Sequence, residues 1–323
     1  MREESKIPTS TGKKLKMTSE FSTKTSMAVV GSLSMVGSRF CELSSRSFSL
    51  IKTDLKGDIS IDITQRDSVD AFFKNHDFEW LILFSAFTDV DAAEKQRGDK
   101  NGLCYLINVK GTASVVDACK NSNRKLIFIS TDFVFDGQNG PYSEESQPGG
   151  NPPKVSWYGL TKIEAENYVR ENLANFLILR IAYPYRGRFA AKDDIAKRIL
   201  RLYLKNQLYP MFSDQVITPT FIDDLSKAVK LLISSGQEGI FHLVSPRETT
   251  QFEFAKEVIK VFRGDLNKLK SGSIIEFLKD PSNTPRPQNG GLKVDRIKAL
   301  GFKPTDWQEG IKIIYKQSAG KLI

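Results

Sequence analysis

A tyrosine and a lysine one helical turn apart are the first residues in this sequence that could do chemistry. Tyr158 and Lys162 lie four positions apart in WYGLTK, which looks like the start of a helix. That spacing places both side chains on one face. An ammonium group stabilises a neighbouring phenolate, so the pKa of the tyrosine should fall from about 10 towards working pH. Such a tyrosine can protonate a carbonyl oxygen while hydride reaches the carbon.

Thr131 is the third candidate, and it follows an apolar run. Residues 126–129 read as a buried parallel strand, and Ser130 and Thr131 come where that strand should end. Open α/β sheets bind ligands outside the carboxyl ends of their strands. The Thr131 hydroxyl could therefore hydrogen-bond the same carbonyl oxygen. A Tyr-x-x-x-Lys pair by itself is common, and it gains meaning here from this strand and from a glycine-containing turn near residue 31.

Several longer segments follow one another in an order that is typical of one enzyme superfamily. With them the chain resembles the extended short-chain dehydrogenase/reductases, and within these the dTDP-4-dehydrorhamnose reductases. The likeness begins after residue 26 and covers nearly all of the remaining chain. The matching segments are SAFTDVDAAE (85–94), STDFVFDG (130–137), PYSEE (141–145) and YGLTKIEAE (158–166), with weaker matches in SDQVITPT (213–220), GIFHLVS (239–245), NTPRPQNGGL (283–292) and DWQEGI (306–311).

The resemblance implies an α/β fold with a doubly wound parallel sheet of the Rossmann type. Residues 27–186 would form the NAD(P)-binding domain, and residues 187–323 a smaller, interleaved substrate-binding portion, with segments near 217–245 returning to the first domain. Residues 1–26 are rich in Ser, Thr and Lys without periodicity, so we expect a disordered basic tail.

The elements that must position the candidate residues can be placed from apolar runs and helical periodicity. We expect strands at 27–30, 49–53, 80–84, 126–129, 176–181 and 241–244. We expect helices at 108–119, 193–203, 221–233 and 252–262, and we expect Asp223 or Asp224 to cap the third of these.

The turn after the first strand, GSLSMVG, is the expected dinucleotide site. Gly31 allows a tight turn, Gly37 allows a helix to approach the strand, and the N–H groups of that helix would meet the pyrophosphate. Ser34 replaces the middle glycine of the superfamily fingerprint. We expect its hydroxyl to donate to a phosphate and the affinity for cofactor to be weaker. The predicted contacts in this turn are Gly31, Ser34, Met35, Val36 and Gly37.

Asp54 ends the second strand about 20 residues beyond the glycine turn, where a carboxylate binds the adenosine ribose and repels a 2′-phosphate. That would favour NADH, although a plain loop aspartate is an equal alternative, and either NADPH or NADH remains the expected cofactor. The resemblance implies that Asp62 and Ile63 contact the adenine. It also places the exit of the third strand beside the ribose and pyrophosphate, through Ser85, Ala86 and Phe87, and gives Asn108 the task of bracing this strand end.

By resemblance, Thr131 polarises a sugar ketone, Tyr158 protonates it, and Lys162 lowers the pKa of the tyrosine and holds the nicotinamide ribose. Asp132 would orient the sugar. Phe133 replaces a tyrosine that is frequent in the family, which removes one possible hydrogen bond to substrate.

Two further residues are expected on the substrate side. Tyr183 stands where the family often has a tryptophan that contacts substrate. Arg286 is a candidate for the substrate diphosphate, but Gly290 and Gly291 stand where a second arginine often follows.

Composition excludes some classes of protein. The net charge of +9 could attract nucleic acid, but no nucleic-acid module is visible. A solvated surface or a nucleotide ligand explains the excess of positive charge as well. There is no apolar run of about 18 residues and no secretory signal. Three scattered cysteines fit a reducing compartment, so we expect a cytoplasmic protein. His76 and His242 stand alone. We expect His242 to be packed, and no catalytic metal.

The resemblance predicts an NAD(P)H-dependent reductase of a nucleotide-linked keto-deoxysugar, most simply dTDP-4-dehydrorhamnose. Dimers are common in the family, so a homodimer is possible. Dehydration is disfavoured because Phe133 and Val134 cannot supply the acid that it needs. The alternatives are a related sugar-nucleotide epimerase and a non-catalytic regulatory subunit that resembles the β subunit of methionine adenosyltransferase.

Overall fold

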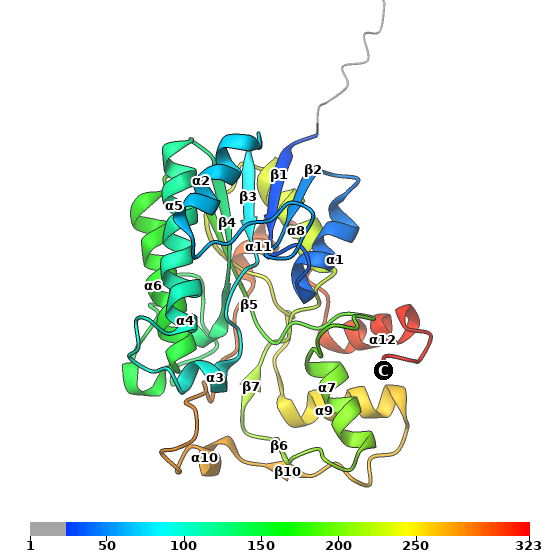
Figure 1. Cartoon of the computed structure of the whole chain (residues 1–323). Coiled ribbons are helices and arrows are strands. Elements are labelled where there is room, and N and C mark those ends of the chain that lie inside the picture. The colour runs from blue at the N-terminus through cyan, green and yellow to red at the C-terminus, as the bar shows by residue number, and fades with distance from the viewer. Residues whose placement is uncertain (1–23) are drawn as a thin grey trace, which may run out of the picture.

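A six-stranded parallel sheet forms the centre of the computed structural model, which describes residues 24–323 (Figure 1). The chain order reverses between β1 and β3, and ligands of such sheets bind outside the carboxyl ends of the strands at this point. The expected α/β fold class is confirmed. In spatial order the strands are β2 (Ser49–Thr53), β1 (Ser26–Val30), β3 (Trp80–Leu83), β4 (Lys125–Thr131), β5 (Phe176–Ile181) and β8 (Gly239–His242).

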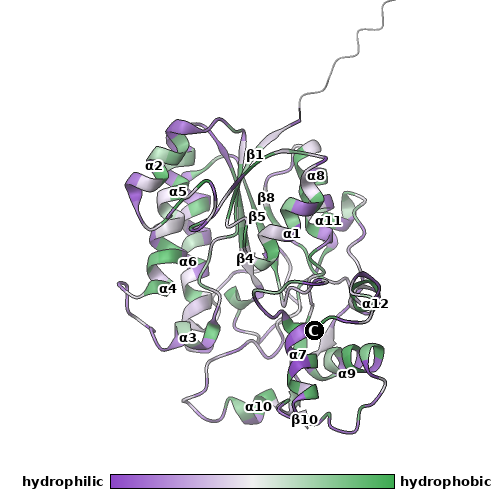
Figure 2. Cartoon of the chain, turned by 45° about the vertical axis from the view of Figure 1, so that its right-hand side comes forward, coloured by the Kyte–Doolittle hydropathy of each residue, from purple (hydrophilic) through white to green (hydrophobic). Residues whose placement is uncertain are grey.

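Helices cover both faces of this sheet, which is why its strands read as continuous apolar runs. Along β1, Met27 and Val29 pack into one apolar cluster, whereas Ala28 and Val30 pack into another. Figure 2 shows the two helical layers on either side of the sheet. One layer contains α1 (Met35–Ser44), α8 (Asp224–Ser234) and α11 (Asp295–Ala299); the other contains α2 (Arg66–Asn75), α5 (Thr112–Asn121) and α6 (Trp157–Asn172).

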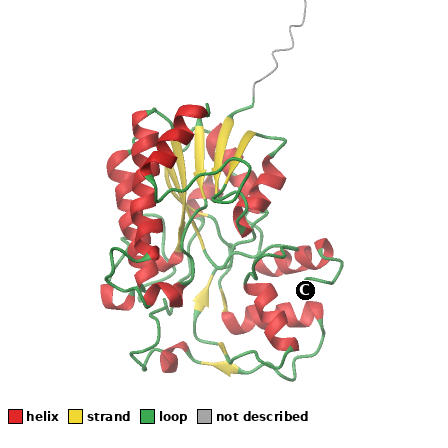
Figure 3. Cartoon of the chain, viewed as in Figure 1, coloured by secondary structure: helices red, strands yellow, loops and turns green. Residues whose placement is uncertain are grey.

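A smaller, mostly helical part lies beyond the carboxyl ends of the strands, at the bottom of Figure 3. Three of its helices share an apolar cluster of their own that includes Ile199, Phe254 and Ile311. The helices are α7 (Ile195–Leu204), α9 (Gln251–Phe262), α10 (Ile274–Phe277) and α12 (Trp307–Gln317), and the short strands are β6 (Met211–Phe212), β7 (Val216–Ile217), β9 (Thr249–Thr250) and β10 (Ser271–Gly272). The remaining short helices, α3 (Val90–Glu94) and α4 (Leu103–Tyr105), follow β3.

The second half of the chain returns to the sheet through two elements. β8 pairs with β5, and α8 lies in the same layer as α1. The proposed division at residues 186 and 187 stays a prediction. The predicted tail, 1–26, falls almost wholly outside the described residues, and its last residue, Ser26, already belongs to β1.

The helix expected at 221–233 begins later, at Asp224, and neither proposed cap acts as one. Asp223 occupies the N-cap position, but its carboxylate binds Arg39 Nη2 at 2.6 Å. Asp224 accepts hydrogen bonds from the N–H of Thr305 at 2.6 Å and from its hydroxyl at 2.8 Å. Phe221 is outside the helix because it forms a bridge with Tyr185.

Other boundaries also differ from the expected ones: β3 ends at Leu83 instead of 84, and β4 spans Lys125–Thr131 instead of 126–129. Asn108 lies in a π-helical turn, Leu106–Gly111, that precedes α5. The strand expected at 241–244 is β8, which begins and ends two residues earlier, and the helix expected from residue 193 begins at Ile195 with Asp194 as its cap.

His242 is packed and satisfied, as expected. Its Nδ1 lies 2.9 Å from the carbonyl oxygen of Lys293, and its Nε2 lies 3.4 Å from Arg180 Nη1. The three cysteines, Cys41, Cys104 and Cys119, are buried free thiols. Between residues 24 and 323 there is no group of three potential metal ligands, and no helix there combines the length and apolar character that a membrane crossing needs.

Candidate active site

The first turn of α6 packs directly on the residues that follow β4. β4 ends at Thr131, and a single 3-10 turn, Asp132–Val134, comes next. A Cβ atom at Gly159 would lie only 2.1 Å from the carbonyl oxygen of Phe133. Ser156 caps the helix, because its Oγ accepts a hydrogen bond from the Gly159 N–H at 3.2 Å. Glycine at this position therefore allows Tyr158 to approach the end of β4.

Thr131 and Tyr158 meet at this contact. The Thr131 hydroxyl donates to Asp132 Oδ1 at 3.0 Å and accepts from the N–H of Phe133 at 3.2 Å. Burial raises the pKa of Tyr158 above its ordinary value, and the nearby Thr131 side chain offsets part of that effect. The two hydroxyl groups that were expected to share a carbonyl oxygen are thus adjacent.

Lys162 lies one turn further along α6 and is only 2% exposed. Its Nζ donates to the carbonyl oxygen of Ile129 at 2.8 Å and lies 3.8 Å from the centre of the Phe128 ring. Burial lowers the pKa of Lys162 to about 7, and the carboxylate of Glu166 partly opposes this. We expected an ammonium group that lowers the pKa of Tyr158. Instead, burial is the main cause of the pKa shifts of Tyr158 and Lys162, because each group loses its hydration.

The glycine turn forms a close-fitting backbone cradle. Gly31 has φ +88°, and a Cβ atom there would lie 2.8 Å from the N atom of Ser85. A Cβ atom at Gly37 would lie 2.2 Å from the carbonyl oxygen of Gly31. Met35 and Val36 open α1, so their N–H groups are among those that a helix leaves without intrahelical partners. These residues fit a bound pyrophosphate, whose charge the helix start favours.

The Ser34 hydroxyl forms its hydrogen bonds within the glycine turn. It donates to the carbonyl oxygen of Gly31 at 2.7 Å and accepts from the N–H of Gly37 at 3.0 Å. A hydroxyl has one hydrogen, so in this structure it is not available to a phosphate. The expected phosphate contact of the Ser34 hydroxyl is therefore replaced by a helix cap.

Asp54 is held against the same turn. Its Oδ2 accepts from the N–H of Leu33 at 2.9 Å, and its Oδ1 accepts from the N–H of Leu55 at 2.8 Å. Asp62 binds both the N–H and the hydroxyl of Thr64, at 2.9 and 2.7 Å. Ile63 is buried against Gly111, in the π-helical turn.

Asn108 connects the exit of β3 with α6. Its Oδ1 accepts from the N–H of Phe87 at 2.8 Å, and its Nδ2 donates to the carbonyl oxygen of Phe87 and to the Thr161 hydroxyl, both at 3.1 Å. The expectation that Asn108 braces this strand end is met. Since Ser85 touches Gly31 and Thr161 lies between Tyr158 and Lys162, Ser85, Ala86 and Phe87 join the cofactor turn to the acid–base residues.

The substrate side is lined by aromatic rings and by Asp132. The Phe133 ring lies 6.0 Å from Tyr158 and 6.3 Å from Tyr183, and Tyr183 has a φ of +42°, which is uncommon outside glycine. Burial raises the pKa of Asp132 to about 7. Arg286 pairs with Asp91 of α3 at 2.6 Å. Burial raises the pKa of Tyr183, and the charge of Arg286 offsets part of that effect, so Arg286 also lies near this group.

Gln215 was missed by sequence reasoning. It lies in SDQVITPT just before β7 and is completely buried, with Nε2 at 2.9 Å from the carbonyl oxygen of Pro287 and 3.4 Å from the Tyr183 hydroxyl. The matching segment was visible in the sequence, but nothing in it showed that this side chain reaches Tyr183.

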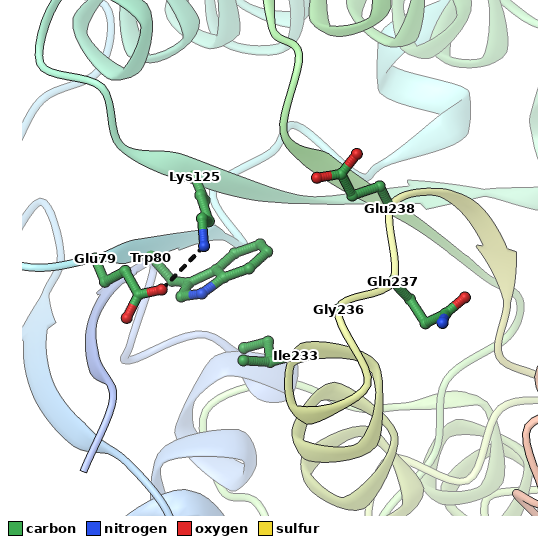
Figure 4. A pocket seen from close by; sticks show the side chains of 7 residues that line it. All are labelled: Glu79, Trp80, Lys125, Ile233, Gly236, Gln237 and Glu238. Atoms are coloured by element: carbon green, nitrogen blue, oxygen red, sulfur yellow. Dashed lines mark hydrogen bonds and ion pairs between the residues drawn. The ribbon is translucent and has the colours of Figure 1, made fainter. Parts of the chain in front are cut away.

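A separate hollow lies at the amino ends of the strands, where Trp80 begins β3 and Lys125 begins β4 (Figure 4). Lys125 Nζ pairs with Glu79 at 3.0 Å on its rim. The volume of about 80 Å³ is too small for a nucleotide. The acid–base residues are at the other end of the strands, so this hollow is not the candidate site.

Comparison with known proteins agrees with this geometry. A dTDP-4-dehydrorhamnose reductase from Sinorhizobium fredii is 30% identical over 265 residues, which cover 78% of this chain and 85% of that protein. A probable low-salt glycan biosynthesis reductase from Haloferax volcanii, Agl14, is 27% identical over 70% of this chain and 73% of its own. The crystal structure of a dTDP-4-dehydrorhamnose reductase from Bacillus anthracis in complex with NADP superposes with a TM-score of 0.77 at 26% identity, covering 91% of this chain and all of that one.

The family model described as the RmlD substrate binding domain matches residues 25–319. The match includes the cofactor turn, the acid–base residues and the smaller helical part, and this chain therefore belongs to the RmlD substrate binding domain family.

Proposed function

We propose that this protein reduces the keto group of a nucleotide-linked 4-keto-6-deoxysugar, and that its substrate is dTDP-4-dehydrorhamnose, which becomes dTDP-rhamnose. The chain is an NAD(P)H-dependent oxidoreductase of the sugar-nucleotide type. The observation that carries the proposal is the close packing of the first turn of α6 on the end of β4, which brings Tyr158 near Thr131, with Lys162 one turn further along the helix.

In the proposed reaction, the Thr131 hydroxyl turns from Asp132 Oδ1 to the substrate carbonyl oxygen, and the Tyr158 hydroxyl donates to the same oxygen. When NAD(P)H is bound, it supplies the hydride that reaches the carbonyl carbon. Tyr158 gives its phenolic proton to the oxygen, so that C=O becomes CH–OH. Lys162, whose pKa is lowered to about 7, is poised to return a proton towards the tyrosine near neutral pH. Gly31 and the start of α1 would hold the cofactor pyrophosphate.

The site favours reduction over dehydration. Phe133 and Val134, which follow the Thr-Asp pair, are buried and apolar, so they cannot act as the acid that water loss needs. The substrate is expected to be a free nucleotide sugar, with no nucleic-acid partner. A homodimer and a cytoplasmic location stay predictions.

A regulatory subunit that binds a dinucleotide without catalysis is the second candidate. Two observations favour it: Ser34 uses its hydroxyl inside the turn, and Arg286 is already paired with Asp91. Such a protein would resemble the β subunit of methionine adenosyltransferase.

The deciding experiment is NAD(P)H oxidation by purified protein with dTDP-4-dehydro-6-deoxyhexose. We expect Tyr158→Phe to lower turnover by about 100-fold or more, the scale of general acid catalysis. Tyr168→Phe is the matched control, because Tyr168 is on the same helix but binds Asp117 at 2.8 Å. Absence of wild-type turnover on any keto-sugar nucleotide, with dinucleotide still bound, would favour the regulatory candidate.

A further inference from the structure

The side-chain amide of Gln215 has a fixed orientation. Its nitrogen faces the carbonyl oxygen of Pro287 at 2.9 Å, and a carbonyl can only accept. The same nitrogen reaches the Tyr183 hydroxyl at 3.4 Å. The amide oxygen, Oε1, is buried and has no hydrogen-bond partner among residues 24–323. Leaving a buried acceptor unpaired costs about 1–3 kcal/mol.

Asp132 presents a second buried acceptor. Its Oδ1 accepts from the Thr131 hydroxyl at 3.0 Å, whereas its Oδ2 has no partner within the described part of the chain. A Cβ atom at Gly290 would lie 3.4 Å from this Oδ2. Burial raises the pKa of Tyr158 and of Tyr183, and the nearby Asp132 carboxylate adds to both shifts.

One loop, residues 287–290, lies beside both side chains. The N–H of Gly290 donates to the carbonyl oxygen of Val216 at 3.0 Å, and the N–H of Val216 donates to that of Gln288 at 2.8 Å, so this loop is fixed beside Gln215. A side chain at position 290 would contact Pro287 and approach Asp132 Oδ2. Glycine at position 290 therefore leaves the space beside this acceptor free of a side chain.

Two unpaired acceptors call for a ligand with two donors. A phosphate at neutral pH offers only acceptor oxygens, whereas sugar hydroxyls can donate. We propose that Gln215 recognises a second hydroxyl group of the sugar, next to the one at Asp132, which is already expected to orient the sugar; this rests on the proposed function. Asp132 follows Thr131, which binds the C4 carbonyl oxygen. We therefore assign to Asp132 a hydrogen bond from the adjacent C3 hydroxyl. Gln215, whose Nε2 lies 3.4 Å from the Tyr183 hydroxyl, recognises the C2 hydroxyl.

The test compares wild type and Gln215→Met with two substrates: dTDP-4-dehydro-6-deoxyhexose and its 2-deoxy analogue. Gln215→Met should lower kcat/KM at least about 10-fold for the first substrate, because a hydrogen bond is lost. It should change kcat/KM less than about 2-fold for the 2-deoxy analogue. Gln215→Asn, which keeps the amide but withdraws it by one methylene, should show the same split if the Met variant does not fold. Gln237→Met, in the hollow at the amino ends of the strands, is the control.

Equal losses on both substrates would mean that Gln215 only supports Tyr183, and would overturn the inference. If wild type reduces neither substrate, the proposed function fails, and calorimetric binding decides instead. Gln215→Met should then weaken dTDP-rhamnose about 10-fold and leave dTDP unaffected. Unchanged affinity for dTDP-rhamnose, or equal weakening of both ligands, would overturn the assignment of Gln215.

Discussion

Arg180 donates two hydrogen bonds to Glu166 in the interior of the protein, from Nε at 2.9 Å and from Nη2 at 2.6 Å. The two side chains are 0% and 1% exposed. Arg180 also stacks over the Phe135 ring at 5.1 Å. The pair joins β5 to α6 one turn beyond Lys162, so it fixes the helix that carries the acid–base residues to the sheet.

Replacing one member of this ion pair should destabilise the fold more than replacing both members. Arg180→Met leaves the Glu166 carboxylate buried without its partner, and we expect a loss of about 3–5 kcal/mol in the free energy of unfolding. The double variant Arg180→Met/Glu166→Gln should be more stable than Arg180→Met alone, because no charge is left unpaired. Denaturant unfolding measures both. Lys279→Met, which breaks an exposed pair with Glu276, should change stability by less than about 0.5 kcal/mol. Additive losses in the double variant would contradict the expectation.

His242 should make the fold sensitive to acid. Burial, followed by the charge of Arg180, lowers its pKa to about 3 from an ordinary 6.5. Below pH 6.5 the unfolded chain therefore binds a proton that the folded chain refuses until about pH 3, and stability falls across that window. We expect His242→Asn to lose less stability than wild type between pH 7 and 4, measured by denaturant unfolding.

Asp132 acts in the opposite direction, because its pKa of about 7 in the fold makes the folded chain the better proton acceptor as the pH falls. This contribution is common to wild type and to the His242 variant, so it cancels in the comparison. His76→Asn, at the partly exposed histidine, is the matched control. An identical pH dependence in wild type and His242→Asn would show that His242 titrates normally.

Asp54 should set the choice between the two nicotinamide cofactors. Its carboxylate is held beside the glycine turn by the N–H of Leu33, where it would repel a 2′-phosphate. We expect Asp54→Asn to raise the ratio of kcat/KM for NADPH over NADH by about 10-fold, which corresponds to about 1.4 kcal/mol of removed repulsion. Asp58→Asn, an exposed residue of the same loop, should leave the ratio unchanged. An unaltered ratio in Asp54→Asn would place the adenosine ribose elsewhere.

Much of the fold was predictable because burial on two faces leaves a plain trace in the chain. The strand at 176–181 was placed with the bounds that the structure has, since a strand covered on both faces reads as an almost continuous apolar run. The edge strand at 49–53 also has its predicted bounds, although only Leu50 and Ile51 in it are apolar. The helical spacing of Tyr158 and Lys162 likewise fixed their common face before any tertiary contact was known.

Polar partners and protonation were decided only by the tertiary structure. Asp223 looked like a helix cap, yet its partner Arg39 lies 184 positions away, and Arg286 pairs with Asp91 across 195 positions. The pKa of Lys162 depends on which groups exclude water around it, and Gln215 gains its place from Pro287 and Tyr183. Apolar periodicity is a local property of the chain, whereas hydrogen bonds and desolvation depend on neighbours that only folding brings together.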